Sequence, residues 1–354
     1  MRDLFTVGPV NMFERSLRVA SEPIPYFRNQ AFSDVMTEIK EDFLSFLNAP
    51  EGSGFVLLTS SGTGGMEAAV MNLCKQGDTV LVINGGTFGA RFAEIVSLHG
   101  FRLLECKISF DEDLTEAALA PFENEKIDVV CVNIHETSVG KLYDGKLLGE
   151  FARRKGALFI VDAISSFLAD EIDMREFNAD VIITGSQKAL AVDAGVSLIA
   201  LSPEAVKKQA EVNCRSLYFG FGNYLKDMER GQTPFTPAVG TVLTIQDRMR
   251  GIKEKGLQSE IDRCKTLAEY CRKAIKKLPL SVPSYRKSNC LTPIIFADGQ
   301  AKAMNEYLVK NYDIHITPSG GANADRLARI GHIGNHDIAG LDRLIKAMEE
   351  FYGL

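Results

Sequence analysis

Hydrophobic residues form a series of short runs between residues 54 and 202, and amphipathic stretches follow several of these runs. Compact apolar runs predict strands that are buried on both faces of a sheet, and the amphipathic stretches predict the covering helices. The expected helices are 65–73, 88–98, 114–122 and 147–154. The expected strands are 55–60, 79–83, 102–108, 128–134, 157–163, 180–185 and 196–202. The pattern predicts an α/β fold on a parallel or mostly parallel sheet.

The pattern changes after Pro203, where a polar stretch rich in aromatic residues leads into two expected helices at 239–253 and 257–277. The last part of the chain predicts a smaller α+β module, packed with part of the first fifty residues. We therefore expect a large domain at residues 15–250 and a small C-terminal domain at 251–354, with residues 1–14 as an N-terminal segment. The module's expected strands are 291–296, 313–317 and 326–331, and its expected helices are 300–311 and 336–351.

Composition narrows the class of protein. Hydrophobic residues make up 45% of the 354 residues and charged residues 24%, which is typical of a soluble globular protein. The net charge is −6, and no block of like charge favours a nucleic-acid or anionic-lipid partner. A small molecule is therefore the expected partner.

The seven cysteines include no CxxC pair, which favours free thiols in a reducing compartment. No stretch has the apolar core of a signal peptide or the ~18 apolar residues of a membrane helix. The sequence therefore predicts a cytoplasmic protein without membrane contact. His332 and His336 are the one histidine pair with helical spacing, but Gly334 and Asn335 between them disfavour a helix. No metal site is therefore expected.

A glycine-rich turn, SSGTGGMEAAV (60–70), joins an expected strand to an expected helix. A helix start of this kind offers unpaired N–H groups and the positive end of the helix dipole to an anion such as phosphate. The spacing completes neither GxGxxG nor GxxxxGK[ST], which argues against a dinucleotide or a nucleoside triphosphate. Taken alone, the turn could also be a simple tight connection.

Two charged residues follow buried strands. Asp162 ends the strand 157–163, so its carboxylate would point into the crevice at the carboxyl ends of the strands, or else cap a helix. Lys188 follows the strand 180–185 by three residues and has apolar neighbours. A lysine in such a place shifts its pKa readily and can act as a covalent amine, although it could also extend to the surface.

The anion cradle, the carboxylate and the lysine are together the three contacts that pyridoxal 5′-phosphate needs. The phosphate would bind at the helix start, and the carboxylate would keep the pyridine nitrogen protonated so that the ring acts as an electron sink. The lysine would form the covalent bond to the cofactor. The residues therefore favour an enzyme that depends on pyridoxal phosphate.

Eight segments spread over nearly the whole chain resemble the class V aminotransferases, which are PLP-dependent transferases of fold type I. Within that family the chain is similar to the alanine–glyoxylate, serine–pyruvate and 2-aminoethylphosphonate–pyruvate enzymes. Cysteine desulfurases share the fold, but they have a histidine where Gln187 stands. The segments are FTVGPVNM (5–12), SSGTGGMEAAV (60–70), INGGTFGAR (83–91), HETSVG (135–140), IVDAISS (160–166), GSQKAL (185–190), QTPFTPAV (232–239) and RIGHIGN (329–335).

The resemblance implies a role in cofactor binding for several residues. Gly62, Thr63 and Gly64 would hold the phosphate together with Gln187. Phe88 would stack on the face of the pyridine ring, unless it is an ordinary core phenylalanine.

The remaining implied roles involve the ring, the substrate and a second subunit. Thr137 would hydrogen-bond the phenolic oxygen of the cofactor, Asp162 would pair with its ring nitrogen and Lys188 would carry it covalently. Thr236 would reach the phosphate in the other subunit, so the working unit would be a homodimer with shared active sites. Arg329 would bind the substrate carboxylate through two hydrogen bonds rather than form a surface ion pair.

The implied reaction is a ping-pong transamination from a small amino acid, alanine or serine, to glyoxylate or pyruvate. Two alternatives stay open: a 2-aminoethylphosphonate–pyruvate transaminase, because arginine binds both carboxylates and phosphonates, and a PLP-dependent lyase. Side chains near Val7 to Met12 and in the partner's loops are expected to select the amino donor.

Overall fold

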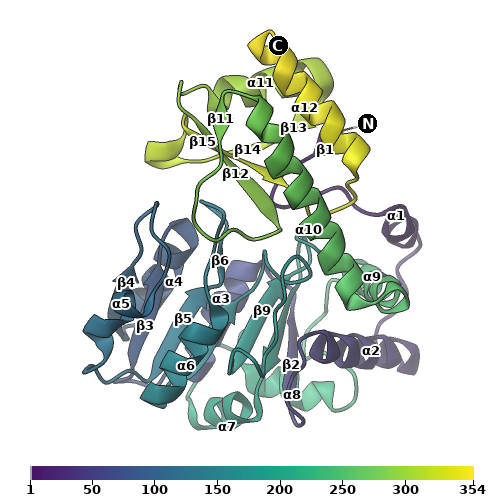
Figure 1. Ribbon diagram of the computed structural model, residues 1–354. Coiled ribbons are helices and arrows are strands. Elements are labelled where there is room, and N and C mark those ends of the chain that lie inside the picture. The colour runs from purple at the N-terminus through teal and green to yellow at the C-terminus, as the bar shows by residue number, and fades with distance from the viewer. Residues whose placement is uncertain (1) are drawn as a thin grey trace.

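Figure 1 shows a computed structural model of the chain, in which residues 2–354 are described. Its largest sheet has seven strands in the order β2-β10-β9-β8-β5-β3-β4. All neighbouring strands are parallel except at β10, which runs antiparallel to both β2 and β9. The predicted α/β fold with a mostly parallel sheet is therefore confirmed. The strands are β2 (Gly54–Leu58), β3 (Thr79–Asn84), β4 (Arg102–Lys107), β5 (Val129–Asn133), β8 (Leu158–Asp162), β9 (Val181–Gly185) and β10 (Ser197–Leu201).

Apolar residues that alternate along these strands cover both faces of the sheet. In β2, Val56 and Leu58 pack in the cluster that includes α3 (Gly62–Leu73) and α4 (Thr87–Leu98), whereas Leu57 packs in the cluster on the other face. Burial on both faces explains why the inner strands read as largely apolar runs, whereas the edge strand β4 has exposed ends at Arg102 and Lys107. The helices α7 (Pro203–Glu211) and α8 (Phe221–Met228) share the face of α3, and α6 (Gly145–Lys155) belongs to the other.

A second sheet, with the strand order β11-β12-β15-β14, forms the smaller module above the large sheet (Figure 1). The N-terminal β1 (Asp3–Leu4) joins this module by pairing in parallel with β13 (Ile314–His315). The other elements are β11 (Leu280–Ser281), β12 (Leu291–Phe296), β14 (Thr317–Pro318), β15 (Leu327–Gly331), α10 (Leu257–Ala274), α11 (Ala301–Tyr312) and α12 (Ile338–Tyr352).

Several elements differ from the sequence-based expectation. The helices α1 (Glu14–Ala20) and α2 (Gln30–Phe46) were not expected, and both pack on α9 (Val239–Lys255). The helices α7 and α8 were also missed, α8 within the aromatic-rich stretch. Instead of one helix at 114–122, the structure has α5 (Glu116–Leu119) and a 3-10 turn (Ala120–Phe122) with proline at its start. Proline disrupts the α-helical hydrogen-bond pattern and so ends α5 early.

The seven cysteines are free, and six of them are buried. Over residues 2–354, no helix combines the length and the apolar character that crossing a membrane requires. His332 hydrogen-bonds Thr292 (2.8 Å), whereas His336 bonds the carbonyl of Leu4 (2.9 Å). The two histidines therefore have separate structural partners.

Candidate active site

The carboxyl ends of β5, β8 and β9 meet the start of α3 and α4 at one edge of the large sheet, beneath the smaller module (Figure 1). Open α/β sheets bind their ligands at this edge. Asp162 is the last residue of β8, and Lys188 lies three residues beyond the end of β9. The two charged residues singled out in the sequence therefore share one crevice.

The glycine-rich segment forms the first turn of α3, which begins at Gly62 rather than at residue 65. Ser61 caps this helix by accepting a hydrogen bond from the N–H of Gly64 (3.4 Å). A Cβ on Gly62 would lie 2.3 Å from a methyl group of Ile164, so a larger residue there would have to displace that side chain. Since the first N–H groups of a helix lack acceptors within it, this turn offers donors to an anion.

Asp162 is a buried carboxylate. One of its oxygens accepts a hydrogen bond from the N–H of Ile164 (2.8 Å), so Asp162 does not cap a helix. Burial raises the pKa of Asp162 to about 7, although this N–H group and the charge of Lys188 oppose the rise. A buried carboxylate favours a cation beside it, and a protonated pyridine nitrogen is such a cation.

Lys188 is mostly covered, and its ammonium group donates a hydrogen bond to the carbonyl of Val7. The N-terminal segment packs directly on it, because a Cβ on Gly8 would lie 2.6 Å from Cδ of Lys188. Burial lowers the pKa of Lys188, and the nearby charge of Asp162 opposes that change. A lysine with a lowered pKa loses its proton more readily, as a nucleophilic amine must.

Thr137 belongs to a buried chain of hydrogen bonds at the end of β5. Its hydroxyl lies 2.7 Å from the hydroxyl of Ser165, which lies 2.9 Å from Nδ1 of His135. Burial lowers the pKa of His135 to about 3, so the ring is neutral. Nε2 of His135 is buried and has no partner among the described residues.

Arg329 lies in the middle of β15. Its two terminal nitrogens donate to the carbonyls of Thr137 (3.0 Å) and Pro318 (3.1 Å). Burial lowers the pKa of Arg329 to about 10, which leaves the guanidinium charged at neutral pH. It is buried and has no acidic ion-pair partner among the described residues, so it is not a surface ion-pair residue.

A cavity of about 400 Å³ opens beside Arg329. Phe88, in the first turn of α4, lines this cavity and is only partly buried, unlike an ordinary core phenylalanine. The guanidinium of Arg91 lies 4.8 Å from the centre of the Phe88 ring and donates to the hydroxyl of Thr63 (3.1 Å). Arg91 therefore connects the start of α3 with the cavity.

Two expected site residues lie apart from these contacts. Gln187 is partly buried, and its side-chain oxygen has no partner among the described residues. Thr236 is exposed on the segment before α9, where the N–H of Ala238 donates to the hydroxyl of Thr59 (3.0 Å). Arg91 lies in the segment 83–91, but no local signal in the sequence marks it as a site residue.

These residues fit pyridoxal phosphate, because one crevice combines a helix start with free donors, a buried carboxylate and a lysine with a lowered pKa. The fold and the site thus define a PLP-dependent enzyme of fold type I. Residues 25–332 match the family model "Aminotransferase class-V". The chain belongs to the class V aminotransferase family, and it is a PLP-dependent aminotransferase.

Known proteins similar to this chain match it over most of its length. The "Soluble hydrogenase 42 kDa subunit" of Anabaena cylindrica is 29% identical, over 94% of this chain and 88% of that protein. The L-aspartate–glyoxylate aminotransferase of Paracoccus denitrificans is 26% identical, over 94% of this chain and 86% of that protein. The crystal structure of alanine–glyoxylate aminotransferase from Nostoc sp. covers 99% of this chain and 95% of its own, with a TM-score of 0.93. At 23% identity, that structure supports the fold alone.

Proposed function

We propose that this aminotransferase moves an amino group from a small amino acid, alanine or serine, to glyoxylate or pyruvate in a ping-pong reaction. The observation that carries the proposal is a buried, charged Arg329 in a cavity of about 400 Å³, at the crevice that holds Lys188 and Asp162. The volume suits a small substrate with a carboxylate for Arg329. The names of the Paracoccus and Nostoc proteins support glyoxylate as the amino acceptor.

The cofactor's phosphate would bind the first turn of α3 through Gly62, Thr63 and Gly64, with Gln187 beside it. The helix start supports that assignment, because the first N–H groups of α3 have no acceptor within the helix, and the side-chain amide NH2 of Gln187 would donate to the phosphate. Phe88 would cover one face of the ring.

Asp162 would hold the proton on the ring nitrogen, and Thr137 would contact the phenolic oxygen. When bound, pyridoxal phosphate supplies an electron sink for the substrate's amine-bearing carbon. Nζ of Lys188 would hold the cofactor and, once released, accept the proton from that carbon. Its lowered pKa supports this role, because a neutral amine is needed for both tasks.

A panel of amino donors tests the function. Alanine, serine and 2-aminoethylphosphonate are supplied in turn with glyoxylate or pyruvate, and the oxo acid products are measured. Turnover of alanine or serine that requires the acceptor supports the proposal. Exclusive use of the phosphonate, or turnover without an acceptor, would instead assign the phosphonate transaminase or the lyase.

Changing Arg329 to lysine keeps the charge and removes the paired hydrogen bonds of the guanidinium. We expect the KM to rise about tenfold or more for both the donor and the acceptor, because each carries its carboxylate to the same place. The cofactor's absorption spectrum should not change. Steady-state kinetics with each substrate varied in turn make the measurement, and unchanged values for both would remove Arg329 from the substrate site.

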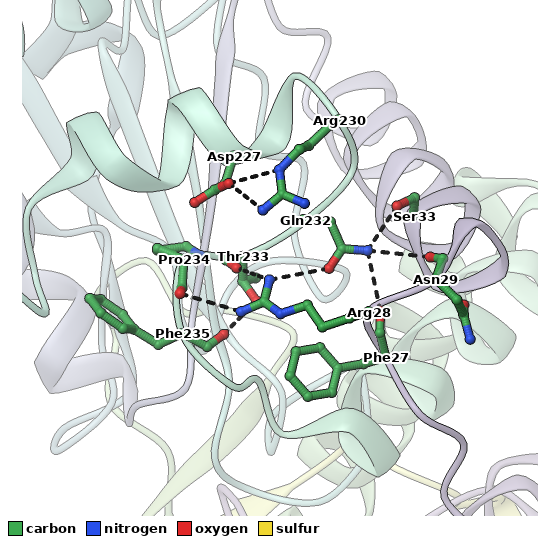
Figure 2. A network of polar contacts seen from close by, with 10 residues as sticks. All are labelled: Phe27, Arg28, Asn29, Ser33, Asp227, Arg230, Gln232, Thr233, Pro234 and Phe235. Carbon is green, nitrogen blue, oxygen red and sulfur yellow. Dashed lines mark hydrogen bonds and ion pairs between the residues drawn. The ribbon is translucent and has the colours of Figure 1, made fainter.

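We propose that two chains form each working unit and that Thr236 reaches the partner's site. Exposed apolar side chains near the Thr236 segment support a subunit interface: Ile24 is 68% exposed and lies near Gly240, and Tyr218 stacks on Phe235. Figure 2 shows how Arg28 holds this segment, with its guanidinium bonded to the carbonyls of Thr233 and Pro234.

Mixing two defective variants tests the shared site. In a hybrid of Thr236→Ala and Lys188→Ala chains, one site has both defects and the other has neither. We expect each parent to be impaired and the hybrid to recover measurable activity, assayed after subunit exchange has been demonstrated with labelled chains. A hybrid no more active than its parents would contradict the shared site.

The domain division at residues 15–250 and 251–354 and a cytoplasmic location are also our proposals. The separate cores of the two sheets support the first, and the free, mostly buried thiols support the second. Limited proteolysis tests the boundary near residue 250, and fractionation of cells tests the location.

A further inference from the structure

Glu136 is a fully buried carboxylate next to the Arg329 cavity, and none of the roles above uses it. It lies in β6 (His135–Glu136), which pairs with β7 (Lys141–Leu142). Its Oε2 accepts hydrogen bonds from the N–H groups of Phe88 (3.2 Å) and Gly89 (3.0 Å). Its Oε1 accepts from both the N–H (3.2 Å) and the hydroxyl of Ser138. Among the described residues, no lysine or arginine pairs with it.

These contacts fill the start of α4. The N–H of Thr87 donates to the hydroxyl of Ser138 (3.2 Å), so the N–H groups of Thr87, Phe88 and Gly89 all bond to Glu136 or Ser138. Glu136 also lies directly behind the chain at Gly86, where a Cβ would approach its Cδ to 2.6 Å. The positive end of the α4 dipole is therefore used by the protein itself and is not free for a substrate anion.

The cavity in front of this carboxylate has a simple charge pattern. Of the described residues that line it, Arg329 alone carries a formal charge. The others offer hydroxyl, amide, backbone or apolar groups, among them Phe110, Ser138, Ser319 and Asn323. The negative charge of Glu136 acts on Arg329 and helps to keep it protonated against the effect of burial. Arg329 is thus the one cation in the lining, with Glu136 behind the wall at Gly86 and Arg91 behind the ring of Phe88.

We infer that Glu136 is a positioning residue that restricts this cavity to substrates with a single anionic group. The inference rests on the proposed function, because it takes the cavity as the place where the substrate binds. A first carboxylate pairs with Arg329. A second would find no further cation in the lining of the cavity and would be repelled by Glu136 behind its wall. The substrates are therefore amino acids and oxo acids with uncharged side chains.

Binding of two non-reacting acids to the holoenzyme tests the inference. Succinamate and succinate have nearly the same size and differ by one negative charge, and calorimetry measures the Kd of each. We expect succinamate to bind the wild-type enzyme roughly tenfold more tightly or better. Glu136→Gln keeps the size of the side chain and removes its charge, so the ratio of the two Kd values should fall towards one. An equal preference in wild type, or an unchanged ratio in Glu136→Gln, would overturn the inference.

Two further variants separate charge from folding effects. Glu105→Gln removes a carboxylate from β4 that bonds the side chain of Asn84 (2.7 Å), and it should keep the wild-type ratio. Asn323→Lys places a second cation at an exposed position of the cavity and should shift the preference towards succinate. If Glu136→Gln does not fold, an unchanged ratio in Asn323→Lys would still contradict a restriction by charge.

The outcome is distinguishable from a failure of the proposed function. An enzyme that turns over alanine or serine but binds succinate as well as succinamate contradicts the inference alone. An enzyme that turns over neither donor contradicts the proposed function, whatever the ratio of the two Kd values.

Discussion

Lys188→Ala should abolish the bond between protein and cofactor that borohydride can reduce, and turnover should fall by about 10³-fold or more. The reason is that Nζ of Lys188 is proposed both to hold the cofactor covalently and to move the substrate's proton. The phosphate contacts at the start of α3 do not involve this side chain, so reversible binding of the cofactor should survive. Mass spectrometry after reduction detects the adduct, and an assay of the oxo acid product measures turnover.

Lys208→Ala is a matched control for this change. Lys208 is also partly buried, with 22% of its side chain exposed, but it pairs with Asp78 and lies outside the crevice. Its removal should leave both the adduct and the turnover intact. A reducible adduct that persists in Lys188→Ala would assign the covalent bond to another lysine.

Asp162→Asn should lower turnover by roughly ten- to a thousandfold, which corresponds to about 1.4 kcal/mol in the activation free energy for each factor of ten. Asparagine keeps the shape of the side chain but removes the charge that holds a proton on the ring nitrogen. Cofactor binding should therefore suffer less than kcat. Single-turnover kinetics at saturating cofactor make the comparison, and near-normal turnover would contradict the role of Asp162.

Asp180→Asn is the matched control for Asp162→Asn. Asp180 also has a pKa raised by burial, but it accepts the N–H of Phe159 (2.9 Å) at the opposite end of the sheet. This change should leave the chemical step of correctly folded enzyme unaltered.

The apoprotein of Asp162→Asn should be more stable than the wild-type apoprotein at pH 8. The folded pKa of about 7 lies above the ordinary value of 3.8, so the folded state binds the proton more tightly than the unfolded state. Ionised Asp162 therefore lowers the free energy of unfolding of the wild-type apoprotein. This loss is absent below pH 3.8, grows as the pH rises and is complete above pH 7, where it is on the order of 4 kcal/mol. Urea unfolding of both apoproteins at pH 5 and pH 8 measures it, and the difference should shrink at pH 5.

The alternation of apolar runs and amphipathic stretches predicted the large sheet well. The strands β2, β3, β5, β8, β9 and β10 are buried on both faces, so their sequences are largely apolar runs that local patterning can detect. The unexpected helices α1 and α2 carry a weaker signal. Their partner α9 lies more than 180 residues further along the chain, and contact with it rather than local pattern completes their packing.

The residue types of the site were also visible in the sequence. Three of its features have a local signature: a glycine-rich helix start after a strand, a carboxylate at a strand end and a lysine among apolar residues. Glu136 had none, since it reads as one polar residue in HETSVG. It became prominent because folding brings β6 against the start of α4, where the carboxylate meets the N–H groups of Phe88 and Gly89.

The sequence by itself thus determined the order of the elements, the class of fold and the candidate lysine and carboxylate, because those depend on local apolar pattern and on motif spacing. Only the tertiary structure decided that Arg329 lies at this crevice. Its guanidinium donates there to the carbonyl of Thr137, which is 192 residues away in the sequence. The tertiary structure also decided which pKa values shift, since burial of Asp162 and Lys188 comes from strands, helices and an N-terminal segment that meet only in the folded chain. Desolvation is a property of the whole surrounding volume, and no stretch of sequence contains that volume.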